Sequence, residues 1–307
     1  MRNEKITLAC MTTPRLDNLK RLLPKVLPFV DKAVIVVGKE VLEADSYLAS
    51  LGPKVQRVYR RWDDSFANQW NEYLKHISGG WCLVLDDDEI PSDNMLESLD
   101  GYINASAMGQ NFCCVEFQSN AIYIDDNGHE HDSGPNTYWR QIFFRKTAHM
   151  TYKGGTKSGC HQYLTGYQNN RLVRCPAEKK QVYYHIKSVS DEHRNAARNY
   201  FIYGIWFHGA QDGVQMADWC ELKSALADAY PTVRTWTDFE PLLISGNIEP
   251  KIKEWMTKWW KKMNDPIEWQ WAKQYNHDGS PYNEGKALIS YYFKYLHSEE
   301  CPEEIKF

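Results

Sequence analysis

The first ninety residues alternate between short apolar runs and segments whose apolar residues recur every three or four positions. The runs predict buried strands at 6–11, 33–37, 55–59 and 81–85. The segments between them predict helices over 16–30, 41–51 and 66–77, the last with Ser65 as its N-cap. This alternation predicts an α/β fold with a mostly parallel sheet covered by helices.

Polar residues come directly after two of these predicted strands. Thr12, Thr13, Pro14 and Arg15 follow the first strand, and Asp86 to Glu89 follow the fourth. In open parallel sheets, ligands bind just beyond the carboxyl ends of the strands. We therefore expect both stretches to lie at one binding site.

The pattern changes after about residue 100. Strands are predicted at 112–118 and 141–145, and another ends at Tyr183–His185. Between the first two, Asp125 to Asn136 reads as a long polar loop, which in a compact domain is usually functional. From about residue 190, apolar stripes at helical spacing predict helices. The expected organisation is an α/β core over 1–188 and a helical extension over 189–307.

Composition excludes some classes of protein. The chain has 307 residues, 43% of them hydrophobic, a net charge of -4 and a pI near 6.2, so it carries no overall basic field for nucleic acid or anionic membranes. It shows no secretory signal pattern and no apolar run long enough to span a bilayer. Its 8 cysteines include no C-x-x-C pair. The expectation is a cytoplasmic protein with free thiols and no transmembrane segment.

The acidic cluster is the strongest chemical signal. Asp86, Asp87, Asp88 and Glu89 follow a buried strand without interruption, and four like charges this close repel one another. Alternate residues of an extended chain point the same way, so Asp86 and Asp88 are expected to share one divalent cation. The alternative is a solvated acidic turn after a strand.

Several motifs in order resemble glycosyltransferase family 2. They are Trp62-Asp63-Asp64-Ser65-Phe66, Asn71-Glu72, Gly80-Trp81, Leu85 to Glu89, then Arg140 to Arg145, Tyr152, Gly155, His161 and Tyr184-His185. The opening Thr12 to Arg15 resembles the family's first nucleotide-contacting loop. The resemblance covers about residues 5–187 and implies the GT-A fold.

The resemblance also implies roles for single residues. Asp88 would ligate Mn²⁺ or Mg²⁺, Asp86 would face the ribose or the metal, and His161 or His185 would complete the metal shell. The nucleotide-sugar would contact residues of three segments: Thr12, Thr13, Pro14, Arg15, Asp64, Asn71, Asp86 and Asp87.

Three positions depart from the family pattern. Trp70 stands where the family has Arg before Asn, so a phosphate contact is either missing or supplied by Arg60 or Arg61. The second strand ends in Val37-Gly38-Lys39 instead of an Asp, which leaves the base of the donor open. Gln162 replaces the Glu that often follows the histidine.

The acceptor side has weaker candidates. Asp132 is favoured as the catalytic base, with Glu116 as its competitor, and Asp125, Asp126 and Glu130 are further acids of the polar loop. Trp139 is the candidate for stacking on an acceptor sugar. Lys258, Lys261 and Lys262 flank an aromatic stripe. They are expected to form the solvated face of an amphipathic helix, or else to bind an anionic acceptor, including nucleic acid, or a membrane surface.

The sequence thus predicts a metal-dependent inverting transferase that moves a hexose from a nucleotide-sugar, by default UDP-glucose, to a hydroxyl group. The acceptor is left open among a glycan, a lipid-linked sugar, a protein side chain and a modified nucleobase in DNA, as is the oligomeric state. The alternatives are an inactive sugar- or nucleic-acid-binding module with a transferase fold, and a nucleotidyltransferase, for which no Walker-type motif is present.

Overall fold

The structure is a computed structural model and contains two compact units. One is formed by residues 1–155 and 161–188, the other by 156–160 and 189–307, and each is considered by itself. The residues described are 4–13, 15–110, 112–124, 129–154, 163–167, 172–175, 180–188, 194–195, 197–198, 224–233, 235–263 and 291–297.

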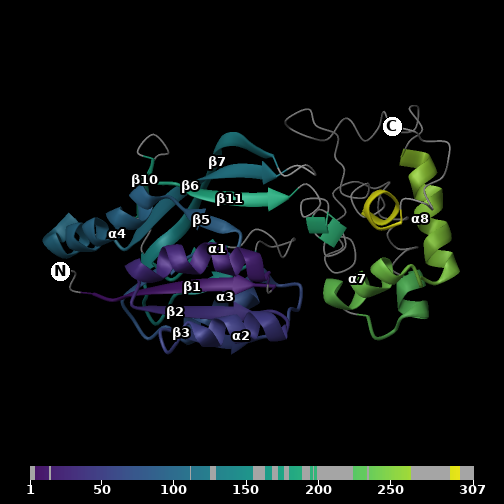
Figure 1. Cartoon of the computed structure of the whole chain (residues 1–307), viewed down its shortest axis with the longest axis horizontal. Helices are drawn as coiled ribbons and strands as arrows, with labels where there is room; N and C mark the ends of the chain where they lie inside the picture. Colours follow the sequence, from purple (N-terminus) through teal and green to yellow (C-terminus); the bar gives the residue numbers. More distant parts are fainter. Residues whose placement is uncertain are drawn as a thin grey trace. The chain divides into compact units, whose positions relative to one another are not determined.

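The first unit is built on one mixed sheet (Figure 1) with the strand order β3-β2-β1-β4-β7-β6-β11-β5 and β10 paired to β6. The strands β3, β2, β1 and β4 run parallel, and β7 joins β4 antiparallel. The strands are β1 (Ile6–Thr12), β2 (Lys32–Val37), β3 (Val55–Tyr59), β4 (Trp81–Val84), β5 (Glu89–Pro91), β6 (Cys114–Ile124), β7 (Glu130–Arg145), β10 (Leu172–Cys175) and β11 (Tyr183–Ser188). A separate hairpin pairs β8 (Thr151–Lys153) with β9 (Tyr163–Thr165).

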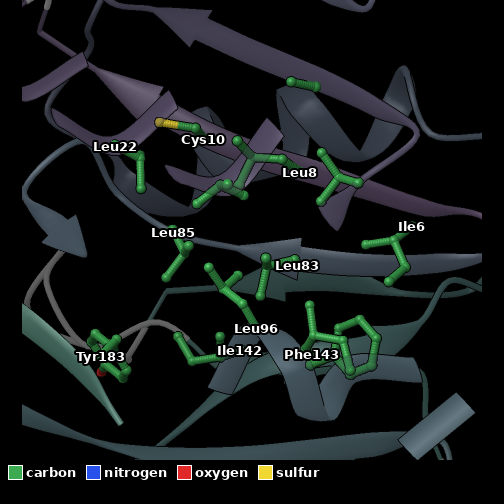
Figure 2. Packing of buried hydrophobic residues seen from close by; sticks show 14 of the residues in the cluster. Ile6, Leu8, Cys10, Leu22, Leu83, Leu85, Leu96, Ile142, Phe143 and Tyr183 are labelled. Atoms are coloured by element: carbon green, nitrogen blue, oxygen red, sulfur yellow. The ribbon is translucent and has the colours of Figure 1, made fainter. Parts of the chain in front are cut away.

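Two apolar clusters cover the two faces of this sheet. Along β1, Leu8 and Cys10 belong to one cluster and Ala9 to the other, as the two-residue period of a strand requires. The first cluster (Figure 2) receives side chains from α1 (Leu16–Val26), α2 (Leu42–Ser50) and α4 (Asp93–Ala105). The second receives those of α3 (Phe66–Lys75). Helices on both faces thus leave the strand ends as the place for a site.

The predicted strands and helices of the first ninety residues are present. Ser65 caps α3 as expected, its hydroxyl accepting a hydrogen bond from the Asn68 amide at 3.2 Å. The helix α1 ends at Val26 and continues as the short 3₁₀ helix η1 (Leu27–Phe29). The helix α4, which ends in the π-helical turn η2 (Ser106–Gln110), was not predicted, although Ser92 caps it in the same way as Ser65 caps α3.

The prediction of a polar loop from Asp125 to Asn136 is wrong for the second half of that range, which forms a strand. Residues from Glu130 onward belong to β7, which pairs with β6 as a long antiparallel hairpin. Backbone hydrogen bonds of a hairpin do not require apolar side chains, and register shifts absorb the irregular stretch, where Gly134 has a φ of 78°. Asp125 and Asp126 lie outside the described residues.

The second unit is helical where it is described. It contains α7 (Trp236–Ser245), α8 (Pro250–Met263), the π-helical segment η6 (Tyr291–Leu296) and a helical stretch over 224–229. Thr235 and Asp238 form a capping box at the start of α7, and Gly246 ends it in the left-handed conformation. Phe239, Ile252, Met256 and Tyr292 are fully buried in a core of their own. Among the helices described in either unit, none has the length and apolarity to cross a membrane.

Candidate active site

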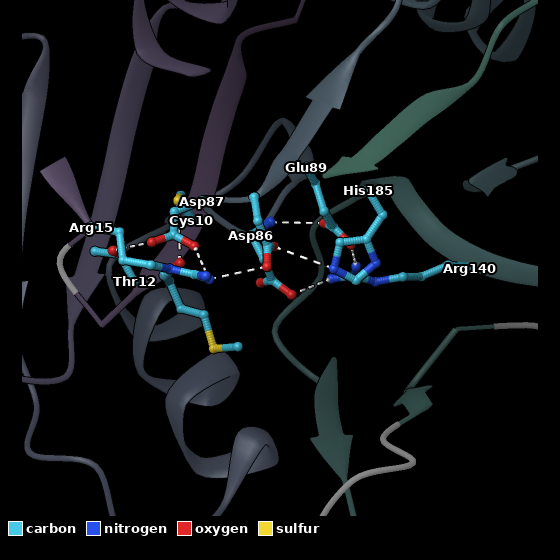
Figure 3. Close-up of polar contacts among 10 residues, drawn as sticks. Cys10, Thr12, Arg15, Asp86, Asp87, Glu89, Arg140 and His185 are labelled. Carbon is cyan, nitrogen blue, oxygen red and sulfur yellow. Dashed lines mark hydrogen bonds and ion pairs between the residues drawn. The ribbon is translucent and has the colours of Figure 1, made fainter. Parts of the chain in front are cut away.

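The acidic cluster lies at the carboxyl ends of β1 and β4, in the first unit. Thr12 is the last residue of β1, and Asp86 follows β4 by two residues. Figure 3 shows the side chains of Thr12, Arg15, Asp86 and Asp87 gathered there, with Arg140 and His185 reaching in from other strands. The two sequence stretches expected to meet do meet.

The four acids form a turn instead of an extended strand. The Glu89 amide donates a hydrogen bond to the Asp86 carbonyl at 3.0 Å, and the Asp88 carbonyl accepts one from the Ile186 amide at 2.9 Å. The extended conformation expected for these residues is therefore wrong, because the chain turns between β4 and β5, while a cation shared by Asp86 and Asp88 stays a prediction. The four acids share two arginines, Arg15 for the middle pair and Arg140 for the outer pair.

Thr12 and Arg15 bind the middle of the turn. The Thr12 hydroxyl donates to Asp87 Oδ2 at 2.6 Å. One guanidinium nitrogen of Arg15 lies 3.1 Å from Asp87 Oδ1 and 3.0 Å from Asp88 Oδ2. The loop after β1 thus supplies a cation to the loop after β4.

Arg140 binds the ends of the turn from β7. Its Nη2 lies 3.2 Å from Asp86 Oδ2, and its Nη1 donates to Glu89 Oε1. The other oxygen of Glu89 accepts from the Asp86 amide at 2.8 Å. Two arginines therefore supply part of the positive charge that the sequence assigned to a metal.

His185 joins the cluster from β11. Its Nε2 lies 3.5 Å from Asp88 Oδ1, so Asp88 sits between His185 and Arg15. The sequence expected His185 near this carboxylate, and the register of β11 against β5, which pairs His185 with Glu89, brings it there.

Burial and charge act differently on the three aspartates. Burial raises the pKa of Asp86 to about 8. The charge of Arg140 lowers this pKa, while the charges of Glu89 and Asp88 raise it further. Burial also raises the pKa of Asp87 to about 6, although Arg15 and Thr12 oppose it. At Asp88 burial works in the same direction, but His185 and Arg15 outweigh it and hold the pKa below its ordinary value. Of the three aspartates, Asp88 is thus the one whose ionised form the site favours.

The donor atoms fit a hard divalent cation in part. Carboxylate oxygens and an imidazole nitrogen are ligands that Mn²⁺ accepts. Asp86 Oδ1 is buried and has no hydrogen-bond partner within the described residues, so it is free to ligate. In the same part of the chain, no group of three or more His, Cys, Asp or Glu side chains is already arranged around one point. At Asp88, Oδ2 pairs with Arg15 at 3.0 Å and Oδ1 lies 3.5 Å from His185, so a metal there would compete with these two cations.

Asp64 and Asn71, both predicted to contact the nucleotide, are held in place by hydrogen bonds to other parts of the protein. Asp64 is 6% exposed, adopts a left-handed φ of 61° and accepts from Trp62 Nε1 at 2.7 Å. Such a backbone conformation is uncommon for a residue other than glycine and is often found at binding sites. Asn71 instead binds the backbone of Tyr152, accepting from its amide at 2.7 Å and donating to its carbonyl at 2.8 Å. Thr13 is exposed, and Pro14 lies outside the described residues.

The two candidate bases differ in environment. Glu116 is 5% exposed, with one oxygen accepting from Gln141 Nε2 at 3.0 Å and the other from Arg174 Nε at 2.9 Å. Asp132 is exposed on β7 and accepts from the Gly134 amide at 2.8 Å. The ring of Trp139 lies 5.5 Å from the Arg174 guanidinium, so a cation already occupies one side of it.

The remaining candidates are only partly described. Trp255 is buried in the core of the second unit, while Lys258 is exposed on α8. Lys261 and Lys262 belong to α8, but their side chains lie outside the described part, as does His161. The sequence missed the roles of Arg140 and Glu89, because nothing in a linear motif shows that β7 pairs with β4.

Residues 39–177 match the family model described as Glycosyl transferase family 2. This stretch includes the acidic turn and Arg140, and over these residues the chain is similar to glycosyltransferase family 2. Its mixed sheet, with a parallel half that ends at the acidic turn, has the GT-A fold. No curated protein matches the sequence.

Three similar solved structures are crystal structures of TarS from S. aureus. The first has 12% identity and a TM-score of 0.40, and covers 93% of this chain and 55% of that chain. TarS 1–349 has 11% identity and a TM-score of 0.40, and its complex with UDP has 9% and 0.37, each covering 96% of this chain and 90% of that chain. The chain thus spans about half the length of the first of these structures.

Proposed function

We propose that this glycosyltransferase moves a hexose from a nucleotide-sugar, with UDP-glucose as the default donor, to a hydroxyl group, and that it uses Mn²⁺ or Mg²⁺. The observation that carries the proposal is the meeting of Asp88, Arg15 and His185 at the carboxyl ends of β1 and β4. A site with both acids and cations suits a metal-bound diphosphate, whose metal needs oxygen ligands and whose phosphates need positive charge.

The protein groups have separate tasks in this proposal. Asp88 and Asp86 would hold the ion with His185, and the bound ion would supply Lewis-acid neutralisation of the leaving diphosphate. Arg15, once released from Asp88, is placed to pair with a phosphate oxygen. Asp64 and Thr12 belong to the segments expected to contact the nucleoside.

The acceptor hydroxyl must lose a proton as it attacks the anomeric carbon. Asp132 is the proposed base, because it is exposed while both oxygens of Glu116 are already hydrogen-bonded. A glycan, a lipid-linked sugar, a protein side chain and a modified nucleobase all offer such a hydroxyl. Trp139 and the lysines of α8, Lys258, Lys261 and Lys262, are the proposed acceptor contacts.

Calorimetry with UDP, with and without Mn²⁺, tests the donor site. We expect wild-type protein to bind UDP more tightly when Mn²⁺ is present, and Asp88→Asn to lose that gain by about 10- to 100-fold, since it removes a ligating charge. Asp93→Asn is the matched control, because Asp93 is exposed and pairs with Lys25 at 2.9 Å. Equal Mn²⁺ dependence in wild-type protein and Asp88→Asn would contradict the proposal.

The products released from a donor distinguish the alternatives. A glycosyltransferase without its acceptor hydrolyses UDP-sugar slowly and releases UDP. A nucleotidyltransferase releases pyrophosphate from a nucleoside triphosphate and a sugar phosphate, and a binding module releases nothing. Repeating the UDP assay with each acceptor class then identifies the substrate that accelerates release.

A further inference from the structure

Arg140 is the one arginine of the site for which the proposed function has no task. It lies on β7, and its side chain is 24% exposed. It reaches Asp86 Oδ2 with Nη2 at 3.2 Å and Glu89 Oε1 with Nη1. Its guanidinium therefore joins the first and last acids of the turn.

This arginine and Glu89 hold Asp86 at two points. Glu89, 1% exposed, accepts from the Asp86 amide through Oε2 at 2.8 Å, while Arg140 holds the Asp86 side chain through Oδ2. A carboxylate fixed at its backbone and at one oxygen has one oxygen left, and this is the buried and unpartnered Oδ1. Figure 3 shows Arg140 approaching Asp86 and Glu89 from the side opposite Arg15.

Trp70 fixes the arginine in turn. The Arg140 guanidinium carbon lies 5.0 Å from the centre of the Trp70 ring, within the range of a cation–π contact. Trp70 is 8% exposed, and its ring meets that of Tyr152 edge-on with centroids 4.8 Å apart. A guanidinium held against a buried ring and bonded to two carboxylates has little freedom to turn.

We propose that Arg140, supported by Trp70, is a positioning residue that orients Asp86 and leaves its Oδ1 free for the ligand. The inference rests on the proposed function, since it assigns Arg140 to the same metal and diphosphate site. Arg140 acts through Asp86 and does not itself contact the donor. Trp70 of α3 stands at the position where the family resemblance expected a phosphate-binding arginine. It contributes to the site indirectly, by packing its ring against Arg140 of β7.

The test separates positioning from general stability. UDP affinity is measured by calorimetry without and with saturating Mn²⁺, for wild-type protein, Arg140→Gln, Arg140→Lys and Trp70→Leu. We expect Arg140→Gln to leave affinity for UDP alone unchanged and to reduce the Mn²⁺-dependent gain about tenfold, the cost typical of losing a group that orients a metal ligand. Arg140→Lys, which keeps the charge but not the two-pronged geometry, restores part of the gain, and Trp70→Leu shows a smaller loss.

Arg145→Gln is the matched control, because Arg145 lies on the same strand and pairs with Glu4 at 2.9 Å. An unchanged Mn²⁺-dependent gain in Arg140→Gln overturns the inference but leaves the proposed function intact, as does an equal loss of affinity with and without Mn²⁺. Absence of any Mn²⁺-dependent gain in wild-type protein overturns the proposed function itself. If circular dichroism shows Arg140→Gln to be unfolded, Arg140→Lys and Trp70→Leu decide: a wild-type gain in both overturns the inference, and a reduced gain supports it.

Discussion

Single residues of this site act through several contacts at once. Asp88 meets two cations from two strands, and Asn71, expected at the nucleotide, instead satisfies both backbone groups of Tyr152. The chemical type of these residues was visible in the sequence. Their partners were not, because Arg15, His185 and Tyr152 each lie more than 70 positions along the chain from the residue that they contact.

Ser92 shows how much one hydroxyl can stabilise. It accepts from the Met95 amide and the Val182 amide, each at 3.2 Å, and donates to the Lys180 carbonyl at 2.9 Å. We expect Ser92→Ala to lower the free energy of unfolding by about 2–3 kcal/mol, because it leaves buried backbone groups without partners. Urea denaturation measures the loss.

Ser65→Ala provides the comparison for Ser92→Ala. Ser65 caps α3 with one described amide bond and is only partly buried, so its loss is expected to cost about 1 kcal/mol. Equal losses at the two positions would show that the extra bonds of Ser92 contribute nothing to stability.

At the scale of the element, pairs of charged side chains on the surface of a helix contribute to its stability. On α3, Glu72 lies 2.6 Å from Lys75 Nζ and 3.5 Å from His76 Nε2. The hydrogen bond from Lys75 lowers the pKa of Glu72, although burial opposes it. A carboxyl whose pKa is lower in the folded state stabilises the protein above its ordinary pKa, and that contribution is lost as the pH falls through the folded value.

We therefore expect Glu72→Gln to destabilise the protein by about 0.5 kcal/mol at pH 7 and by less at pH 3, because the folded-state carboxylate takes up its proton as the pH falls through its lowered pKa. Thermal unfolding at the two pH values measures this. Glu97→Gln, at an exposed position of α4, is the control and is expected to show no such pH dependence. A deficit for Glu72→Gln that is as large at pH 3 as at pH 7 would contradict the assignment to charge.

The whole molecule has two separate cores, and the described residues of the proposed donor site lie in the first unit. Leu83 and Phe143 belong to the core of that unit, while Phe239 and Tyr292 belong to the core of the second. Stability and donor binding can therefore be separated by core substitutions.

We expect Phe239→Ala to destabilise the second unit by about 3–5 kcal/mol while leaving Mn²⁺-dependent UDP binding unchanged. Hydrogen exchange over residues 235–263 reports the loss, and calorimetry reports the binding. Leu83→Ala, in the first core and next to the acidic turn, is expected to weaken both. Loss of UDP binding in folded Phe239→Ala would show that the donor site extends beyond the first unit.

The sequence by itself determined the alternation of strands and helices in the first ninety residues and the position of the acidic turn. Apolar periodicity is a local property, so Val55–Tyr59 and the Ser65 cap of α3 follow from neighbouring residues alone. The same periodicity, with Ser92 as cap, is present in the sequence of α4.

Only the tertiary structure decided which groups meet the acids. Asp86 to Glu89 turn instead of extending because β5 pairs with β11, and Arg140 and His185 reach them because β7 and β11 take their places in the sheet. Such pairings join residues distant in sequence through backbone hydrogen bonds that carry no side-chain signature. The carboxylates could thus be read from the chain, while the cations that hold them depend on the order of the strands.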